Sequence, residues 1–191
     1  MRIVGGQYKG RRIHAPKGET SRPTTDRNRE SLFNILSVRD DIDLENARVL
    51  DLFAGSGALG FEAISRGASF VLFVETDAAA RGAIRDNIEA LGAFGTTRLH
   101  RRSAASLGTK PASAGDKFNL VFADPPYGED LAKPALEGLH HGEWLSPNAL
   151  IIVEQGKKET PVAARHFEEI DRRVYGNTMF GLYRYLATAV L

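Results

Sequence analysis

The chain contains no cysteine among its 191 residues. This absence excludes a disulfide framework, a thiolate metal site and any reaction through a covalent cysteine adduct. Its five histidines show none of the spacings typical of metal ligands, so the predicted chemistry needs no metal. No apolar run approaches the roughly 18 residues that a membrane helix requires, and the N-terminal residues lack the apolar core of a signal peptide. We therefore expect a soluble cytoplasmic protein that has no membrane partner.

Charge is nearly balanced in total but uneven along the chain. Lysine and arginine number 25 against 24 acidic residues, which gives a formal net charge of +1. Residues 1–30 hold eight basic and three acidic residues, or +5, which leaves 17 basic and 21 acidic residues, or −4, for the remainder. A basic arm on a mildly acidic body suits a phosphate-rich partner, although an ordinary solvated surface explains the same pattern.

The length and composition favour one main core. A chain of 191 residues, 42% of them hydrophobic, can bury the core of a single domain. Glycines between short β-compatible runs at the start predict a small hairpin, and a polar linker follows it. We place this basic hairpin and linker at residues 1–24 and the main domain at residues 25–191.

Short apolar runs alternate with helical patterns through the main domain. Strands are predicted at residues 48–53, 70–75, 97–100, 118–123 and 150–154, and helices at residues 25–38, 58–66, 77–91 and 131–140. Two further β-like runs flank a turn at Gly176 and Asn177, which predicts a C-terminal antiparallel hairpin, whereas residues 103–115 are predicted to form a flexible loop. The pattern indicates an α/β fold with a doubly wound, mostly parallel sheet of seven strands.

A glycine-rich turn follows the first predicted strand of this domain. Gly55, Gly57 and Gly60 satisfy the pattern G-x-G-x-x-G, which on its own suggests a dinucleotide site. Asp51 argues against that interpretation, because a carboxylate in a turn without lysine or arginine is a poor neighbour for a doubly negative pyrophosphate. S-adenosylmethionine instead carries a sulfonium and an α-ammonium group. Asp51 can bind the ammonium end while the glycines let the backbone approach closely.

The ends of the next two strands complete the predicted cofactor site. Glu75 ends the second strand and suits a carboxylate that accepts hydrogen bonds from both ribose hydroxyls. After the third strand, where this fold commonly has an acidic residue near the adenine, the chain has Arg102 and Ser103. We expect S-adenosylmethionine as cofactor, leaving as S-adenosylhomocysteine, and no metal. The predicted cofactor-binding residues are Asp51, Phe53, Ala54, Gly55, Ser56, Gly57, Glu75, Thr76, Ser103, Ala104 and Asp124.

The fourth strand runs directly into the tetrapeptide Asp124-Pro125-Pro126-Tyr127, which we predict to be catalytic. Ligands of an open parallel sheet bind beyond the carboxyl ends of its strands, so this loop should lie beside the glycine turn. Two prolines stiffen the loop and remove two N–H donors, which leaves the Asp124 carboxylate and the Pro125 carbonyl as acceptors. Gripping the hydrogens of an exocyclic base amine would turn its lone pair toward the methyl group. Tyr127 offers a face on which an extruded base can stack.

With both motifs in place, the chain resembles the bacterial small-subunit ribosomal RNA guanine-N2 methyltransferases of the RsmD family, which have a Rossmann-like methyltransferase fold. The resemblance covers nearly the whole chain. The segment Arg22-Pro23-Thr24-Thr25 is its most family-specific part, since the other two motifs occur in many amino methyltransferases. The matching segments are residues 2–6, 10–11, 22–27, 29–34, 51–57, 124–127 and 175–176.

The resemblance implies a substrate and further binding residues. It implies methylation of the N2 of one guanine in 16S rRNA, in a partly assembled small subunit, with the base flipped into the pocket of the catalytic tetrapeptide. We expect a monomer. The expected substrate-binding or RNA-binding residues are the basic hairpin pair Arg11 and Arg12, the family-like residues Arg22, Thr24 and Arg27, and the stacking residue Tyr127.

Several other functions stay open at this point. A DNA or RNA adenine-N6 or cytosine-N4 methyltransferase has the same catalytic needs, and only the N-terminal segment tilts the choice. A glutamine side-chain amide methyltransferase would have less use for a basic arm. An NAD-dependent oxidoreductase would place Asp51 against pyrophosphate, and no proton donor is evident for hydride chemistry. A non-catalytic RNA-binding module would have no need for an intact cofactor turn and acceptor loop.

Overall fold

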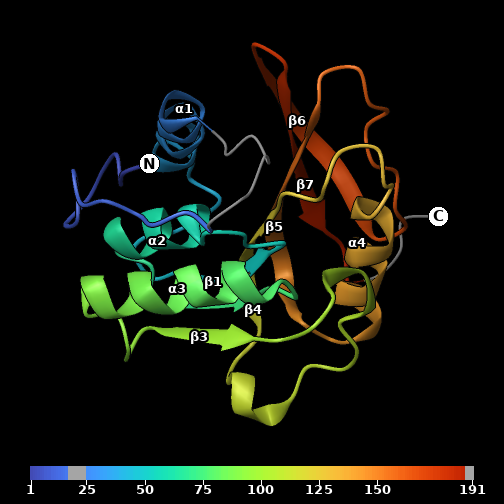
Figure 1. The fold of residues 1–191 in the computed structure, drawn as a ribbon. Coiled ribbons are helices and arrows are strands. Elements are labelled where there is room, and N and C mark those ends of the chain that lie inside the picture. The colour runs from blue at the N-terminus through green and yellow to red at the C-terminus, as the bar shows by residue number, and fades with distance from the viewer. Residues whose placement is uncertain (17–24, 188–191) are drawn as a thin grey trace.

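A computed structural model describes residues 1–16 and 25–187 of the chain (Figure 1). The predicted linker lies almost entirely outside these residues, as do Arg22 and Thr24 among the expected substrate-binding residues. The described part has no helix long and apolar enough to cross a membrane.

The described strands form one sheet in the order β3-β2-β1-β4-β5-β7-β6. The first five strands in this order run parallel, and β7 pairs antiparallel with both β5 and β6. The predicted doubly wound sheet and its closing hairpin are thereby confirmed. The strands are β1 (Arg48–Leu52), β2 (Phe70–Val74), β3 (Thr97–His100), β4 (Phe118–Ala123), β5 (Leu145–Gly156), β6 (Phe167–Tyr175) and β7 (Thr178–Tyr185).

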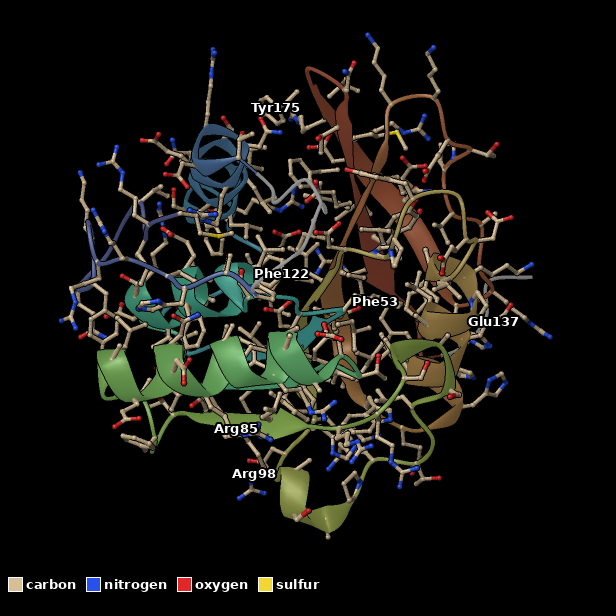
Figure 2. All side chains as sticks on the ribbon, in the orientation of Figure 1. Phe53, Arg85, Arg98, Phe122, Glu137 and Tyr175 are labelled. Atoms are coloured by element: carbon tan, nitrogen blue, oxygen red, sulfur yellow. The ribbon has the colours of Figure 1, made fainter. Side chains whose placement is uncertain are left out.

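Helices cover both faces of this sheet (Figure 1). Neighbouring strand residues such as Val49 and Leu50 point to opposite faces and belong to separate buried clusters. One cluster lies under α1 (Asp26–Ser37), α2 (Ala58–Ser65) and α3 (Ala78–Leu91), and there Phe122 of β4 packs against Phe33 with ring centroids 5.5 Å apart (Figure 2). The other lies under α4 (Ala132–His141) and the short 3-10 helices η1 (Ala104–Ser106) and η2 (Ala112–Ala114).

Two segments differ from the sequence-based expectation. The predicted flexible loop at residues 103–115 contains η1 and η2, because Ala104, Leu107 and Ala114 are buried against the sheet. Strand β5 begins five residues earlier than predicted, at Leu145, since its first part pairs with β4 through a register shift.

The N-terminal hairpin is held against α2 and α3 by hydrogen bonds rather than by strand pairing with the sheet. Its two arms share one isolated antiparallel bridge, between Arg2 and Arg12. The Val4 N–H donates to Glu62 Oε2 of α2 at 2.8 Å, and the His14 N–H donates to Asn87 Oδ1 of α3 at 2.8 Å. These contacts bring the hairpin close to the carboxyl ends of the parallel strands.

Candidate active site

A cavity of about 980 Å³ lies at the carboxyl ends of β1, β2 and β4. Ten of the eleven predicted cofactor-binding residues line it, all except Gly57, and so do all four residues of the predicted catalytic tetrapeptide. The N-terminal arm adds Met1, Ala15 and Pro16 to the wall. Residues far apart in the sequence therefore meet in one cavity, at the sheet edge expected for an open parallel sheet.

The glycines of the turn have separate structural reasons. Gly55 and Gly57 have φ angles of +53° and +78°, a region that disfavours side chains, and Gly57 is the N-cap of α2. Gly60 lies where α2 crosses β2, and a Cβ there would be 2.3 Å from Phe73 Cε1. The turn thus needs glycine for its backbone conformation at two positions and for close packing at the third.

Asp51 is a buried carboxyl group at the floor of the cavity. Its side chain is only 2% exposed, and its Oδ2 accepts a hydrogen bond from the Gly60 N–H at 2.9 Å. Burial raises the pKa of Asp51 to about 8, the Gly60 hydrogen bond opposes that rise, and the charge of Glu75 adds to it. A cationic ligand group in the cavity would favour the charged form of this carboxyl.

Glu75 follows β2 and is already engaged by the backbone. Its Oε2 accepts from the Gly55 N–H at 2.8 Å, and its Oε1 accepts from the N–H groups of Thr76 and Asp77 at 2.7 and 2.8 Å. A carboxylate offers about four acceptor sites, so one remains open. Accepting hydrogen bonds from both ribose hydroxyls, as predicted, requires Glu75 to release one backbone donor or to share an acceptor site.

The catalytic tetrapeptide, residues 124–127, forms a loop that we call the acceptor loop. It directly follows β4, whose last residue pairs with the last residue of β1. The Asp124 N–H donates to the Leu52 carbonyl at 3.4 Å, which ties the loop to the first strand. Burial raises the pKa of the Asp124 carboxyl well above its ordinary value, and the negative charges of Glu154 and Asp51 raise it further. Pro125 is buried, whereas Tyr127 is 47% exposed and leaves much of its ring accessible.

The predicted RNA-binding residues are more dispersed. Arg11 and Arg12 are exposed on the hairpin, away from the cavity wall, and the Arg11 guanidinium donates to the Ala90 carbonyl at the end of α3. Arg27 is exposed in the first turn of α1. The structure therefore brings Tyr127 to the cavity but not the described arginines of the basic arm.

Some residues of the site were missed by the sequence analysis. Glu154 is 3% exposed near the end of β5, and the Tyr127 hydroxyl donates to its Oε1 at 3.4 Å. A signal for it was present, because Glu154 ends an apolar strand run just as Asp51, Glu75 and Asp124 lie at or near strand ends. Arg102 and Met1 also line the cavity, and no sequence pattern had pointed to Met1.

Comparison with known proteins identifies the family. The family model described as "Conserved hypothetical protein 95" matches residues 1–184. The Ribosomal RNA small subunit methyltransferase D of Escherichia coli strain K12 is 37% identical over 185 residues, which is 96% of this chain and 89% of that protein. The protein of the same name from Haemophilus influenzae is 34% identical over 96% of this chain and 93% of its own length. The chain belongs to the RsmD family.

Solved structures agree with this assignment. The RsmD-family chain superposes on the Escherichia coli protein described as methyltransferase yhhF with a TM-score of 0.80 at 36% identity, covering 98% of this chain and 99% of that one. The cyclase SpnF reaches a TM-score of 0.66 at 13% identity, over 92% of this chain and 87% of its own. That second likeness shows the fold alone, so the chemistry of this RsmD-family member has to be argued from its cavity.

Metal binding was predicted to be absent. Within residues 1–16 and 25–187, no group of three or more histidine, aspartate or glutamate side chains is arranged to hold a metal ion. Metal-free chemistry stays a prediction for this RsmD-family protein.

Proposed function

We propose that this RsmD-family protein transfers a methyl group from S-adenosylmethionine to the exocyclic N2 of a guanine in 16S rRNA, acting as a monomer on a partly assembled small ribosomal subunit. One observation carries the proposal: Asp51 of β1 and Asp124, which directly follows the adjacent strand β4, line the same cavity. One carboxyl suits a cationic methyl donor and the other suits an amine. The rRNA substrate is inferred from the relatives named small subunit methyltransferase D.

The cofactor half of the cavity consists of Asp51, the glycine turn and Glu75. Asp51 would bind the α-ammonium group, and Glu75 would bind the ribose. Ser103, in the loop after β3, is exposed and Ala104 is buried beside it, so the adenine would lie against Ser103 and backbone groups. When bound, S-adenosylmethionine supplies a methyl group on a positively charged sulfur, which is a good leaving group, so the protein needs no strong base.

The acceptor half consists of Asp124, Pro125 and Tyr127. The Asp124 carboxylate and the Pro125 carbonyl would accept the two hydrogens of the target NH2 group and direct its lone pair toward the methyl carbon. The target nitrogen would form its bond to the methyl carbon as the C–S bond breaks, so it would carry a positive charge and the cofactor would leave as S-adenosylhomocysteine. That nitrogen loses a proton to Asp124, whose raised pKa suits it as the acceptor, and the proton then passes to solvent.

Tyr127 would hold the flipped base. An open aromatic face contributes roughly 1–3 kcal/mol per stacked base, which helps to offset the cost of unstacking it from the RNA. Arg11, Arg12 and Arg27 would contact phosphates away from the cavity, and Arg22 and Thr24 are proposed to contribute as well. Such contacts strengthen RNA binding without reading the base sequence.

The decisive experiment tests both the cofactor and the methylated atom. Calorimetry should show uptake of S-adenosylmethionine and S-adenosylhomocysteine and no tight binding of NADH. Mass spectrometric mapping of 16S rRNA should then find one N2-methylguanosine that is absent from cells lacking the protein and restored in vitro on their small-subunit particles. Methylation of adenine N6, of cytosine N4 or of a protein amide would overturn the proposed target, and tight NADH binding alone would overturn the reaction class.

A further inference from the structure

Glu154 lies beside the acceptor loop although it belongs to another strand. Strand β5 pairs in parallel with β4 so that Val153 is opposite Ala123, and the next residues of the two strands are Glu154 and Asp124. On its other side Glu154 pairs in register with Phe180 of β7. Glu154 of β5 is therefore level with the residue that follows β4, and its charge acts on Asp124.

The contact between Glu154 and Tyr127 joins this strand to the stacking ring. The Tyr127 hydroxyl donates to Glu154 Oε1 at 3.4 Å. Burial and the charges of Glu154 and Asp124 raise the pKa of Tyr127 to about 12, so the hydroxyl keeps its proton and stays a donor. The outer end of the ring is anchored while the side chain is still 47% exposed.

A second carboxylate holds the same loop one residue later. The Gly128 N–H donates to Glu159 Oε1 at 3.2 Å, and Gly128 has a φ of +76°. The exit of the catalytic tetrapeptide is thus tied twice to β5 and the loop after it. Both ties come from glutamate side chains of a different part of the chain.

We propose that Glu154 is a positioning residue for the methyl-accepting base, acting through the hydroxyl of Tyr127 to set the plane of the ring on which the base stacks. This inference rests on the proposed function. A tyrosine ring turns about two side-chain bonds. An anchored hydroxyl oxygen fixes the direction of the ring axis, and because a phenolic O–H prefers to lie in the ring plane, a hydrogen bond in one direction also favours one plane of the ring. A base stacked on an anchored ring presents its amine to Asp124 in one plane, whereas a free ring would present it over a range of angles and slow transfer.

The first experiment separates positioning from binding. Tyr127→Phe keeps the aromatic face but removes the hydroxyl, and Glu154→Ala removes its partner. Each should lower kcat on small-subunit particles about 10- to 100-fold, change the KM for the particles less than threefold, and leave the affinity for S-adenosylhomocysteine within twofold. The double variant should be no slower than the slower single variant, because both substitutions break one contact. Glu168→Ala, at an exposed position of β6, is the matched control and should retain wild-type kcat.

The conservative variant supplies a second readout. Glu154→Gln keeps an acceptor for the Tyr127 hydroxyl, so it should recover most of the decrease in kcat that Glu154→Ala causes. Glu154→Gln also removes a negative charge that raises the pKa of Asp124, so the acidic limb of its pH–kcat profile should move to lower pH. Asp51 of β1 then remains as the nearby carboxyl that raises the Asp124 pKa. A purely structural role for Glu154 would lower the melting temperature without this shift.

Three results would overturn the inference. Full kcat in Tyr127→Phe would show that the anchor is unnecessary, and this variant stays informative even where Glu154→Ala fails to fold. Multiplying effects in the double variant would show that the two side chains act independently. A Glu154→Gln variant as slow as Glu154→Ala would show that the acceptor is not what matters. Should the wild type methylate a different amine, the proposed function fails, yet the coupling between the two side chains is measured equally well on that base.

Discussion

The two halves of the cavity present their carboxyl groups in different ways. On the cofactor half, Asp51 and Glu75 accept hydrogen bonds from backbone N–H groups of the surrounding turns. On the acceptor half, two prolines remove such donors, and among the described residues no backbone N–H donates to the Asp124 carboxyl. The carboxyl groups of Asp51 and Glu75 are therefore held in place before a ligand arrives. The Asp124 carboxyl keeps its acceptor sites open, which is what an incoming NH2 group requires.

The largest effect is expected on the acceptor half. Asp124→Ala should lower kcat by at least about 1000-fold, because it removes the acceptor that orients the amine and takes up its proton. The affinity for S-adenosylhomocysteine should change only a few-fold, since the cofactor half is intact. Single-turnover methylation and calorimetry measure the two quantities. Asp124→Asn is the matched control, because it keeps one acceptor oxygen and should be less impaired than the alanine variant. Undiminished turnover in Asp124→Ala would refute the assignment.

The converse pattern is expected on the cofactor half. Asp51→Asn keeps an oxygen for the Gly60 N–H but loses the negative charge for the α-ammonium group. We expect the affinities for S-adenosylmethionine and S-adenosylhomocysteine to fall about 10- to 100-fold, with kcat at saturating cofactor much less affected. Calorimetry across a concentration series checks the first effect and initial rates the second. Equal cofactor affinity in variant and wild type would remove Asp51 from the binding site.

The comparison can be sharpened by varying pH. The pKa of Asp51 is about 8 in the folded protein, against about 3.9 for an aspartate in an unfolded chain. Between these values the folded state binds more protons at Asp51, so the free energy of unfolding should fall as pH rises from about 4 to 8 and level off above that. Urea unfolding at several pH values measures this slope. Asp51→Asn should make it shallower, and the remainder should reflect Asp124, whose pKa is also raised.

Ligand uptake tests the same group in a second way. A cation bound at Asp51 lowers its pKa, so binding of S-adenosylhomocysteine at pH 7 should release up to about one proton. The binding enthalpy should then depend on the ionisation enthalpy of the buffer in the wild type and not in Asp51→Asn. The same dependence in both proteins would place the proton release elsewhere.

The smallest effect is expected away from both halves. Reversing the charges of Arg11 and Arg12 should weaken RNA binding while cofactor affinity stays unchanged. The slope of log affinity against log salt should become shallower by roughly 0.7 to 0.9 for each phosphate that these arginines neutralise in the wild type. Filter binding at several salt concentrations measures this slope. Arg172 and Arg173 are the matched control pair, because they form ion pairs with Glu169 and Asp171 on β6. A larger effect at the control pair would move the RNA surface to the C-terminal hairpin.

Much of the fold could be predicted because its buried strands are clear apolar runs. Strands β3 and β4 begin and end at the predicted residues, since polar or turn residues bound each run. The start of β5 could not be predicted, because Pro147 and Asn148 indicate a turn, yet pairing with β4 continues past them through a register shift. The loop at residues 103–115 was misjudged because its few apolar side chains become buried only once α4 is in place.

The candidate site was predictable where a motif is local. Asp51, Gly55 and all four residues of the tetrapeptide line one cavity, whereas Gly57 and Gly60 do not line it. Contacts between distant segments were not predictable. Nothing in the sequence relates Glu154 to Tyr127, because their proximity depends on the order of β4, β5 and β7 in the sheet. The same holds for the engagement of Glu75 by three N–H groups.

One buried amide links the N-terminal hairpin to the glycine turn. Asn87 of α3 is fully buried, and its Nδ2 donates both to the His14 carbonyl at 3.0 Å and to the Ser56 carbonyl at 3.1 Å, while its Oδ1 accepts from the His14 N–H. Asn87 thus joins the hairpin to the glycine turn, and the Ser56 hydroxyl adds a second link by donating to the Met1 sulfur at 3.6 Å. A force that lifts the hairpin off α3 would therefore also pull on the glycine turn, so a partner that displaced the hairpin would disturb the proposed cofactor site.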